Sequence, residues 1–396
     1  MTKENITTLK QISYLDDFKC AADKCPDTCC AKWVINTTVE NKEFYDRESS
    51  EIAKDVEPHS DGAFQMKRQD NDNCIQLQDG MCRVQKEFGE NYLPDVCYTF
   101  PRSYKMIDKE VYMTSNLACP ESLKVALYNN KRSDFTKWSD ITQTRRKTGL
   151  FDSRSDKLSD FSDQEILEIS SKIACMVDDP SCSADESMAR LLLLADAADY
   201  DKNFNWSDID NEIKITTKKN ILQIAKDNPE SVNMRNEMIS ILEVAFNDVY
   251  RDTPRYVEVL DIIKSKIGDH NTDEDTLFGN YEKIYDNWEG VKSDYDYILK
   301  NYIKAQLSYI IFPLNTSFSN QYNSIACIFL EYLLVRLSLS CALYGAEKEL
   351  DQKDVIDVIQ PVAKRFFVKD SHTIYNFCKN KGWDNCKKAI TTIINL

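Results

Sequence analysis

The chain has 396 residues, of which 42% are hydrophobic and 11% aromatic, and this composition excludes a disordered or fibrous protein. Its length predicts about two to three domains. The 50 lysines and arginines against 65 aspartates and glutamates give a formal net charge of −15, which argues against nucleic acid as the main partner and against docking on an anionic membrane.

The first region, residues 1–130, has the pattern of a small irregular module. The segment before residue 20 lacks the apolar core of a signal peptide, so we expect a cytoplasmic protein. Prolines separate short apolar runs, which bury little surface, and a metal centre could supply the missing stability. The pattern predicts strands at Trp33–Thr38 and Val111–Thr114 and short helices at Glu40–Lys54, Arg83–Glu87 and Glu121–Tyr128.

The second region, residues 131–396, reads as a helical domain that we expect to bind the substrate or a partner. A polar linker over 129–160 separates the regions, and Ser162–Glu165 (SDQE) forms a capping box that would start the first helix. Apolar residues then recur at helical spacing and predict helices over 162–177, 185–199, 208–226, 232–250, 255–267, 291–312, 320–344, 353–368 and 371–394. The sequence therefore predicts a mainly α protein, with a cysteine-rich module followed by a multi-helix domain.

The longest apolar stretch, Ile325–Tyr344, is long enough to raise the question of a membrane span. It contains Glu331 and Arg336, and a charge in the middle of a bilayer is costly. We therefore interpret it as a buried helix of a protein that does not enter the membrane.

Glycine and histidine are scarce, which excludes several kinds of site. The 9 glycines are spread so widely that no GxGxxG or P-loop motif exists. With only 3 histidines, a histidine-rich metal site cannot be built, and a Ser-His-Asp triad is disfavoured.

Eight of the 14 cysteines lie before residue 120, a concentration that predicts a metal module. In a reducing compartment, clustered cysteines are more often metal ligands or catalytic groups than disulfides. Thiolates are soft ligands that suit zinc or iron–sulfur clusters, and the residues alone do not choose between them. The eight could hold two four-thiolate centres, or one cluster with an open iron and a structural zinc. The expected ligands are Cys20, Cys25, Cys29, Cys30, Cys74, Cys82, Cys97 and Cys119.

Four sequence segments resemble the flagellin lysine-N-methylase family, whose broader relatives are cysteine-cluster proteins described as zinc- or iron-chelating. They are FKCAADKCPDTCCAKWVI (18–35), CIQLQDGMCRVQKEFGENYLPDVCYTFPR (74–102), LACPES (117–122) and YDYILKNYIKAQLSYIIFP (295–313). The resemblance implies an iron–sulfur cluster of the [4Fe-4S] type held by the eight cysteines. It also implies methyl transfer from S-adenosylmethionine to lysine side chains of flagellin, the expected partner. Family positions outside the cysteines match Trp33, Pro101, Arg102, Pro120 and Glu121.

A lysine ammonium must lose a proton before its nitrogen can attack a methyl sulfonium, so the site needs a base or a low-polarity pocket. Glu121 and Tyr98 are the catalytic candidates near the cysteines. Arg102 could pair with the carboxylate of S-adenosylmethionine. Because no glycine-rich loop exists to hold the adenosine, we expect it to stack on Trp33 or Phe100. Polar and radical methyl transfer both remain open.

The alternative reading is a non-catalytic iron–sulfur or zinc-binding protein, active in metal handling or redox sensing, whose helical domain binds a partner. The helical region also contains stretches rich in tyrosine and acidic residues, at 285–290 and 295–302. An aromatic and acidic groove there would suit an extended, lysine-bearing partner, although ordinary amphipathic helices give the same pattern.

Overall fold

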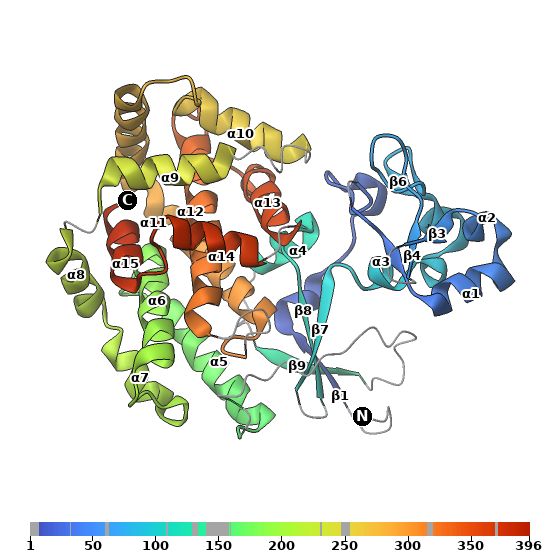
Figure 1. Ribbon diagram of the computed structural model, residues 1–396, viewed down its shortest axis with the longest axis horizontal. Helices are drawn as coiled ribbons and strands as arrows, with labels where there is room; N and C mark the ends of the chain where they lie inside the picture. The colour runs from blue at the N-terminus through green and yellow to red at the C-terminus, as the bar shows by residue number, and fades with distance from the viewer. Residues whose placement is uncertain are drawn as a thin grey trace.

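The computed structural model describes residues 8–31, 33–59, 63–107, 110–128, 134–139, 158, 160–229, 232–246, 254–314, 320–368 and 371–396. Figure 1 shows a large helical body at one end, a small module of short elements at the other, and a sheet between them. The mainly α architecture predicted from the sequence is confirmed.

The sheet between the two parts has the strand order β7-β8-β1-β9. Strands β7 (Arg102–Ile107) and β8 (Glu110–Ser115) form an antiparallel hairpin, and β1 (Thr8–Ile12) runs parallel to β8 and antiparallel to β9 (Phe135–Ser139). Apolar residues from β1 and β8 belong to the same hydrophobic core as the helices. Strand β1 is therefore packed onto the helical body.

The cysteine module has a small hydrophobic core of its own, which includes Cys30, Tyr45, Ile52, Cys74 and Val84. A three-stranded sheet, β2-β4-β3, and a hairpin, β5-β6, frame it. Its elements are β2 (Asn36–Thr37), α1 (Val39–Glu48), α2 (Ser50–Ala53), β3 (Val56–Pro58), β4 (Phe64–Met66), β5 (Leu77–Gln78), β6 (Met81–Cys82), a π-helical turn (Val84–Phe88) and α3 (Asp95–Thr99). A domain boundary near residue 130 stays a prediction.

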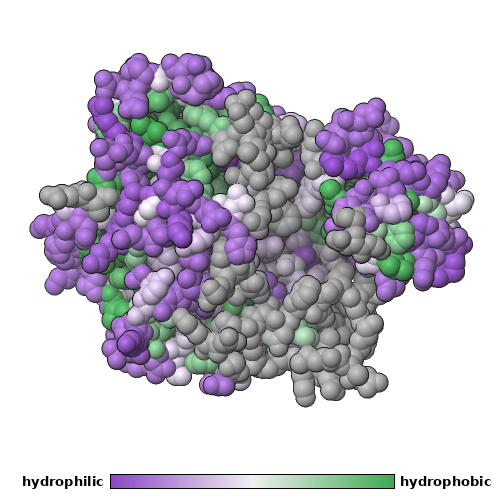
Figure 2. All heavy atoms as spheres, in the orientation of Figure 1, coloured by the Kyte–Doolittle hydropathy of each residue, from purple (hydrophilic) through white to green (hydrophobic). Residues whose placement is uncertain are grey.

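The helical body is built around α12 (Gln321–Leu343), which packs against α6, α11 and α13. The other helices are α4 (Pro120–Leu127), α5 (Asp163–Val177), α6 (Ala184–Tyr200), α7 (Ile209–Ile215), α8 (Lys218–Asp227), α9 (Met234–Phe246), α10 (Pro254–Lys266), α11 (Glu274–Ile310), α13 (Gln352–Val368), α14 (Ser371–Asn380) and α15 (Cys386–Asn395). The capping box predicted at Ser162 and Glu165 starts α5. On the face shown in Figure 2, hydrophilic residues cover most of the coloured surface, and apolar residues form small patches.

Helix α12 has the length and composition to cross a membrane, but 89% of its most apolar window is buried inside the protein. Two of its polar side chains share a partner within the core. Arg336 pairs with Asp185 of α6 at 3.0 Å, and the Tyr332 hydroxyl donates a hydrogen bond to the same carboxylate at 2.7 Å. The interpretation of this stretch as a buried helix is confirmed.

Several predicted boundaries were wrong, and capping residues explain two of them. The expected helix over 208–226 is split because Thr217 caps the start of α8 through its side chain. The expected helix over 371–394 is split by a turn in which Gly382 has φ +74°, and Asn385 then caps α15.

Other expectations were wrong in length or in the type of element. The expected strand Trp33–Thr38 is reduced to Asn36–Thr37, and α11 begins at Glu274, earlier than predicted. Within the expected polar linker over 129–160, β9 adds an edge strand to the sheet. Residues 129–133, 140–157 and 159 of that linker, and 247–250 of the helix expected over 232–250, lie outside the described residues.

The buried Arg336–Asp185 pair makes a stability prediction. Asp185→Ala leaves the Arg336 charge unpaired in the core and should lower the free energy of unfolding by about 3–5 kcal/mol. Asp275→Ala removes the partner of an exposed pair with Arg235 and should cost about 0.5 kcal/mol or less. Urea denaturation followed by circular dichroism compares the two, and equal losses would show that the buried pair is not a core constraint.

Candidate functional site: the cysteine cluster and its junction with the helices

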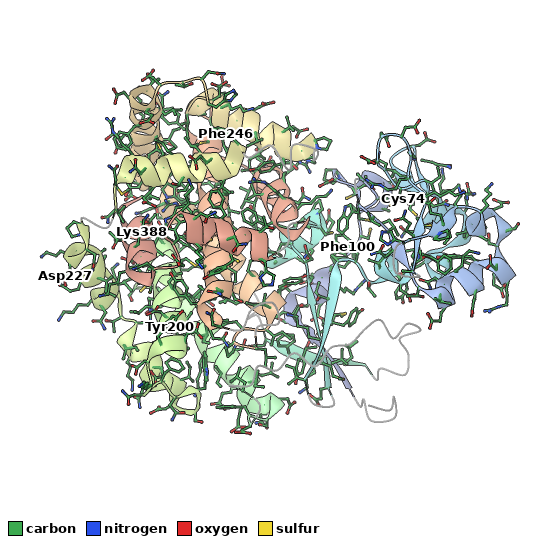
Figure 3. All side chains as sticks on the ribbon, in the orientation of Figure 1. Cys74, Phe100, Tyr200, Asp227, Phe246 and Lys388 are labelled. Carbon is green, nitrogen blue, oxygen red and sulfur yellow. The ribbon has the colours of Figure 1, made fainter. Side chains whose placement is uncertain are left out.

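Hydrogen bonds of the main chain bring the separate cysteine segments together. The Cys74 amide donates to the Cys30 carbonyl at 3.0 Å, which fixes the second cysteine segment beside the first. The β5-β6 hairpin turns at Asp79 and Gly80, both with positive φ, and places Cys82 opposite Leu77. A tight turn of this kind suits an Asp-Gly pair. Figure 3 labels Cys74 inside the module and Phe100 where the module meets strand β7.

Three thiols form the centre of the cluster. The Cys30 thiol lies in hydrogen-bonding contact with Cys29 and with Cys82. The hydrogen bond from Cys30 lowers the pKa of Cys82 to about 6, helped by the amides of Gln85 and Val84, and it also lowers the pKa of Cys29. The pKa of Cys30 is raised because it is the donor to both. A low thiol pKa favours the thiolate, the form that binds metals and attacks electrophiles.

The cluster extends from the module to the helical body through Cys119. Burial raises the pKa of Cys119 to about 12, and the amides of Ser122 and Glu121 at the start of α4 act in the opposite direction. Cys25 and Cys29 also raise this pKa, because each would place a like charge nearby. Cys29 and Cys20 likewise raise the pKa of Cys25, in addition to the effect of burial. The Cys25 thiol donates a hydrogen bond to the Asp27 carbonyl at 3.2 Å.

A buried ion pair ties the cysteine loop to helix α13. Lys364 Nζ lies 2.6 Å from Asp27 Oδ1, and Gln360 Nε2 donates to Asp27 Oδ2 at 2.7 Å. The Gln360 amide also donates to the carbonyl of Ala118, next to Cys119, at 2.6 Å. The side chains of Lys364 and Asp27 are only 5% and 11% exposed. Asp27 therefore acts as a contact between the module and the helical body.

The donors present suit a thiolate-bound centre in their chemistry. Seven of the eight predicted cysteines influence one another through hydrogen bonds or charge, and Cys97, on α3, packs against the core of the module. Within the described ranges, no group of three or more His, Cys, Asp or Glu side chains is arranged to hold a metal ion. The assignment of these cysteines as ligands stays a prediction.

The aromatic and basic candidates lie beside this cluster. Trp33 and Phe100 meet edge to face, with ring centroids 5.1 Å apart and planes at 87°. The Arg102 guanidinium lies 5.2 Å from the centroid of the Phe18 ring. The structure thus brings Trp33 and Phe100 together at the point where the module joins β7, and it places Arg102 at the first position of that strand.

The two catalytic candidates lie on different elements. Burial raises the pKa of Tyr104; the charge of Arg102 lowers this pKa and Tyr98, on α3, raises it. Tyr98 and Arg102 therefore both lie near Tyr104. Glu121 lies in the first turn of α4, and its carboxylate is 4.0 Å from Lys124 Nζ. Neither position tests the assigned roles, which stay predictions.

A buried carboxylate in the helical body was missed as a candidate by the sequence reasoning. Glu331 of α12 accepts hydrogen bonds at Oε1 from the Tyr302 hydroxyl and, at 2.7 Å, from the Gln306 amide. Burial raises the pKa of Glu331 to about 8, although both hydrogen bonds oppose that shift. A carboxyl that titrates near neutral pH is suited to accept or donate a proton. Glutamate inside an otherwise apolar helix was the signal that could have identified it.

Tyr309 of α11 contacts the sheet, and burial is the main cause of its raised pKa. The Tyr309 hydroxyl hydrogen-bonds with the side chains of Asn116 and Ser103, and Glu331 raises its pKa. Lys105 Nζ lies 5.6 Å from the centroid of the Tyr309 ring. Burial lowers the pKa of Lys105 to about 8, so this environment disfavours a lysine ammonium. No sequence pattern pointed to Lys105, because its environment depends on the packing of α11 against the sheet.

Comparison with known proteins identifies the family of the chain. Residues 173–392 match the family model described as the FliB lysine N-methylase C-terminal domain, which is more than half of the chain. The chain belongs to the FliB lysine N-methylase family. The match begins within α5 and ends within α15, so it covers nearly all of the helical body, including Glu331 and Lys364. The family recognised from the cysteine motifs is thereby confirmed.

Individual relatives are similar over shorter stretches. The chain is 28% identical over 159 residues to the lysine-N-methylases of Salmonella choleraesuis (strain SC-B67) and Salmonella typhimurium (strain LT2), which is 36% of this chain and 38% of each relative. It is 30% identical over 129 residues to the flagellar biosynthetic protein FliU of Salmonella muenchen, which is 29% of this chain and 73% of that protein. The alignments therefore span about two fifths of the lysine-N-methylases. No solved structure matches.

The ion pair at the junction predicts a local effect in this FliB-family chain. Lys364→Met leaves Asp27 buried without its cation, and amide hydrogen exchange at Cys25 and Cys30 should become about tenfold faster or more. Lys353→Met is the matched control on the same helix, because its pair with Asp357 is exposed. Hydrogen exchange read by mass spectrometry compares them, and unchanged exchange in Lys364→Met would mean that the pair does not order the loop.

The raised pKa of Glu331 predicts a pH-dependent stability. The folded protein keeps a proton that the unfolded carboxyl has lost, so this residue makes stability fall as pH rises from about 4.5 to about 8, by up to about 1.4 kcal/mol per pH unit. Glu331→Gln keeps an acceptor at Oε1 and should remove this slope. Urea unfolding of both proteins across the window measures it, with Glu282→Gln on the exposed surface of α11 as the control. Parallel pH profiles for wild type and Glu331→Gln would contradict the assignment.

Proposed function

We propose that this protein is a lysine N-methyltransferase that acts on a flagellar protein, with flagellin as substrate and S-adenosylmethionine as methyl donor. The observation that carries the proposal is the match of residues 173–392 to the FliB lysine N-methylase C-terminal domain. Relatives named lysine-N-methylase and flagellar biosynthetic protein support the class of reaction and the flagellar connection.

The reaction sets requirements that the chain's residues can meet. The lone pair of a neutral lysine nitrogen forms the new N–C bond while the C–S bond of the sulfonium breaks, and S-adenosylhomocysteine leaves. The acceptor ammonium must first lose a proton. Glu121 and Tyr98 are the candidates beside the cysteines, and Glu331, a buried carboxyl whose pKa is raised to about 8, is a third group that could exchange a proton.

The cysteine cluster is proposed to hold an iron–sulfur cluster, with zinc as the alternative metal. Its ligands would come from the eight cysteines of the module and of the start of α4, and a bound centre would supply a Lewis-acidic site. Arg102 is proposed to bind the carboxylate of S-adenosylmethionine, and Trp33 and Phe100, which already contact each other, to pack against its adenine. Arg102, Trp33 and Phe100 lie on the module or at its junction with β7.

The proposal predicts that protein purified without oxygen transfers a labelled methyl group from S-adenosylmethionine to flagellin. Cys29→Ala and Cys97→Ala should lose both the bound metal and at least about 90% of the transfer, because each removes an expected ligand. Cys175→Ala, an exposed cysteine on α5 far from the module in sequence, should change neither. Iron, zinc and sulfide per chain and label in flagellin are measured on the same samples.

The outcomes separate the proposed enzyme from its alternative. Metal that is lost with Cys29→Ala, together with no transfer in any sample, would favour a non-catalytic metal-binding protein. Transfer that survives in both cysteine variants would show that the reaction does not need the cluster. Zinc without sulfide would replace the iron–sulfur assignment with a zinc site.

A further inference from the structure

An open groove of about 650 Å³ lies on the helical body away from the cysteines. The middle of α11 forms one wall, and the segment from the end of α12 to the start of α13 forms the other. Tyr128, at the end of α4, closes one side. Because α4 begins directly after Cys119 and rises 1.5 Å per residue, Tyr128 and Cys119 are about 13 Å apart along it.

Tyrosine rings form much of the groove. Tyr128 and Tyr297 meet edge to face, with centroids 6.4 Å apart and planes at 73°. Tyr297 is 51% exposed, so one of its faces is available to a ligand. Tyr295 is held in place by its contact with Trp288 and by a hydrogen bond from the Leu350 amide. The faces of such rings are negative and attract cations.

The polar groups of the groove are acceptors and negative charges. Asp294 and Glu349 line it, and both raise the pKa of Tyr295, which burial also raises. Asn287, an uncharged polar residue, also lines the groove. Lys348, also on the lining, is already paired with Asp354 at 3.3 Å and with Asp351 at 3.7 Å.

We propose that this groove binds a lysine-bearing segment of the protein substrate. The lysine ammonium, or its methylated form, packs on the faces of Tyr128 and Tyr297, near the carboxylates of Asp294 and Glu349. The inference rests on the proposed function for the identity of the ligand, since it takes the substrate to be a protein with accessible lysines. It assigns a docking site that is separate from the cysteine cluster.

The test measures binding by calorimetry on the full chain, without any methyl donor. The probes are a synthetic peptide with one central lysine, the same peptide with trimethyl-lysine, and the same peptide with norleucine in place of lysine. Wild type should bind at least one lysine form and not the norleucine peptide. Tyr297→Ala and Asp294→Asn, both at exposed positions, should weaken that binding by about tenfold, since each removes one cation-binding group.

Tyr200→Ala is the matched control. Tyr200 is 67% exposed at the end of α6 and is also surrounded by acidic residues, but it does not line the groove. Figure 3 labels it on the helical body. Equal losses in Tyr200→Ala and Tyr297→Ala, equal binding of the norleucine peptide, or no binding by wild type would overturn the proposal. Because no methyl transfer is measured, a failed methylation assay leaves this result interpretable, and a failed binding assay leaves the proposed enzyme untouched.

Discussion

The contact between Asp27 and Lys364 is the constraint on which the arrangement of the site depends. Asp27 lies between Cys25 and Cys29, and Lys364 lies on a helix more than 300 residues further along the chain. Two charges taken out of water are stabilising only when they meet each other in good geometry. The cysteine loop therefore has a strong preference for one position against α13, and Gln360 extends the same contact to the residue before Cys119.

This contact explains how a module with little core of its own can take part in a larger site. Its apolar cluster is small, while the sheet and helices share an extensive core. Cys119 belongs by packing to the helical side, and Cys29, Cys30 and Cys82 belong to the module. A centre that uses thiols from both sides would link the two parts further. A site placed at this junction would then respond to any motion between them.

The helices of the body were largely predictable because their apolar spacing is regular. Helices α5, α6, α10, α12 and α13 begin and end within two residues of their predicted bounds. The breaks at Thr217 and Gly382 were not predicted, since a cap or a turn competes there with a continuing apolar pattern. Strand β1 and the edge strand β9 were missed because each is short and is stabilised by partners distant in sequence.

The candidate site also has a part that the sequence predicted and a part that only the folded structure reveals. Eight cysteines are clustered in the first third of the sequence, so the sequence alone predicted a metal module, and in the structure Cys30 is in hydrogen-bonding contact with Cys29 and Cys82. That the eight cysteines bind a metal stays a prediction. Lys105, Tyr309 and Glu331 come from β7, α11 and α12. Burial in the folded protein is the main cause of the pKa shift of each, so the sequence could not indicate these shifts. The groove on the helical body was partly predictable from the sequence. Its tyrosine and acidic content was visible at 285–302, but Tyr128 and Glu349 join it only in the fold.

Peptide mapping of flagellin by mass spectrometry is the most direct test that this FliB-family protein methylates lysine. Flagellin would be produced in the same cells with the intact chain, with no chain, or with the Lys364→Met variant. We expect methyl-lysine in flagellin only when the chain is present, and less of it when the junction is weakened. Unmodified lysines throughout flagellin, in cells that contain folded and metal-loaded protein, would contradict the proposed activity.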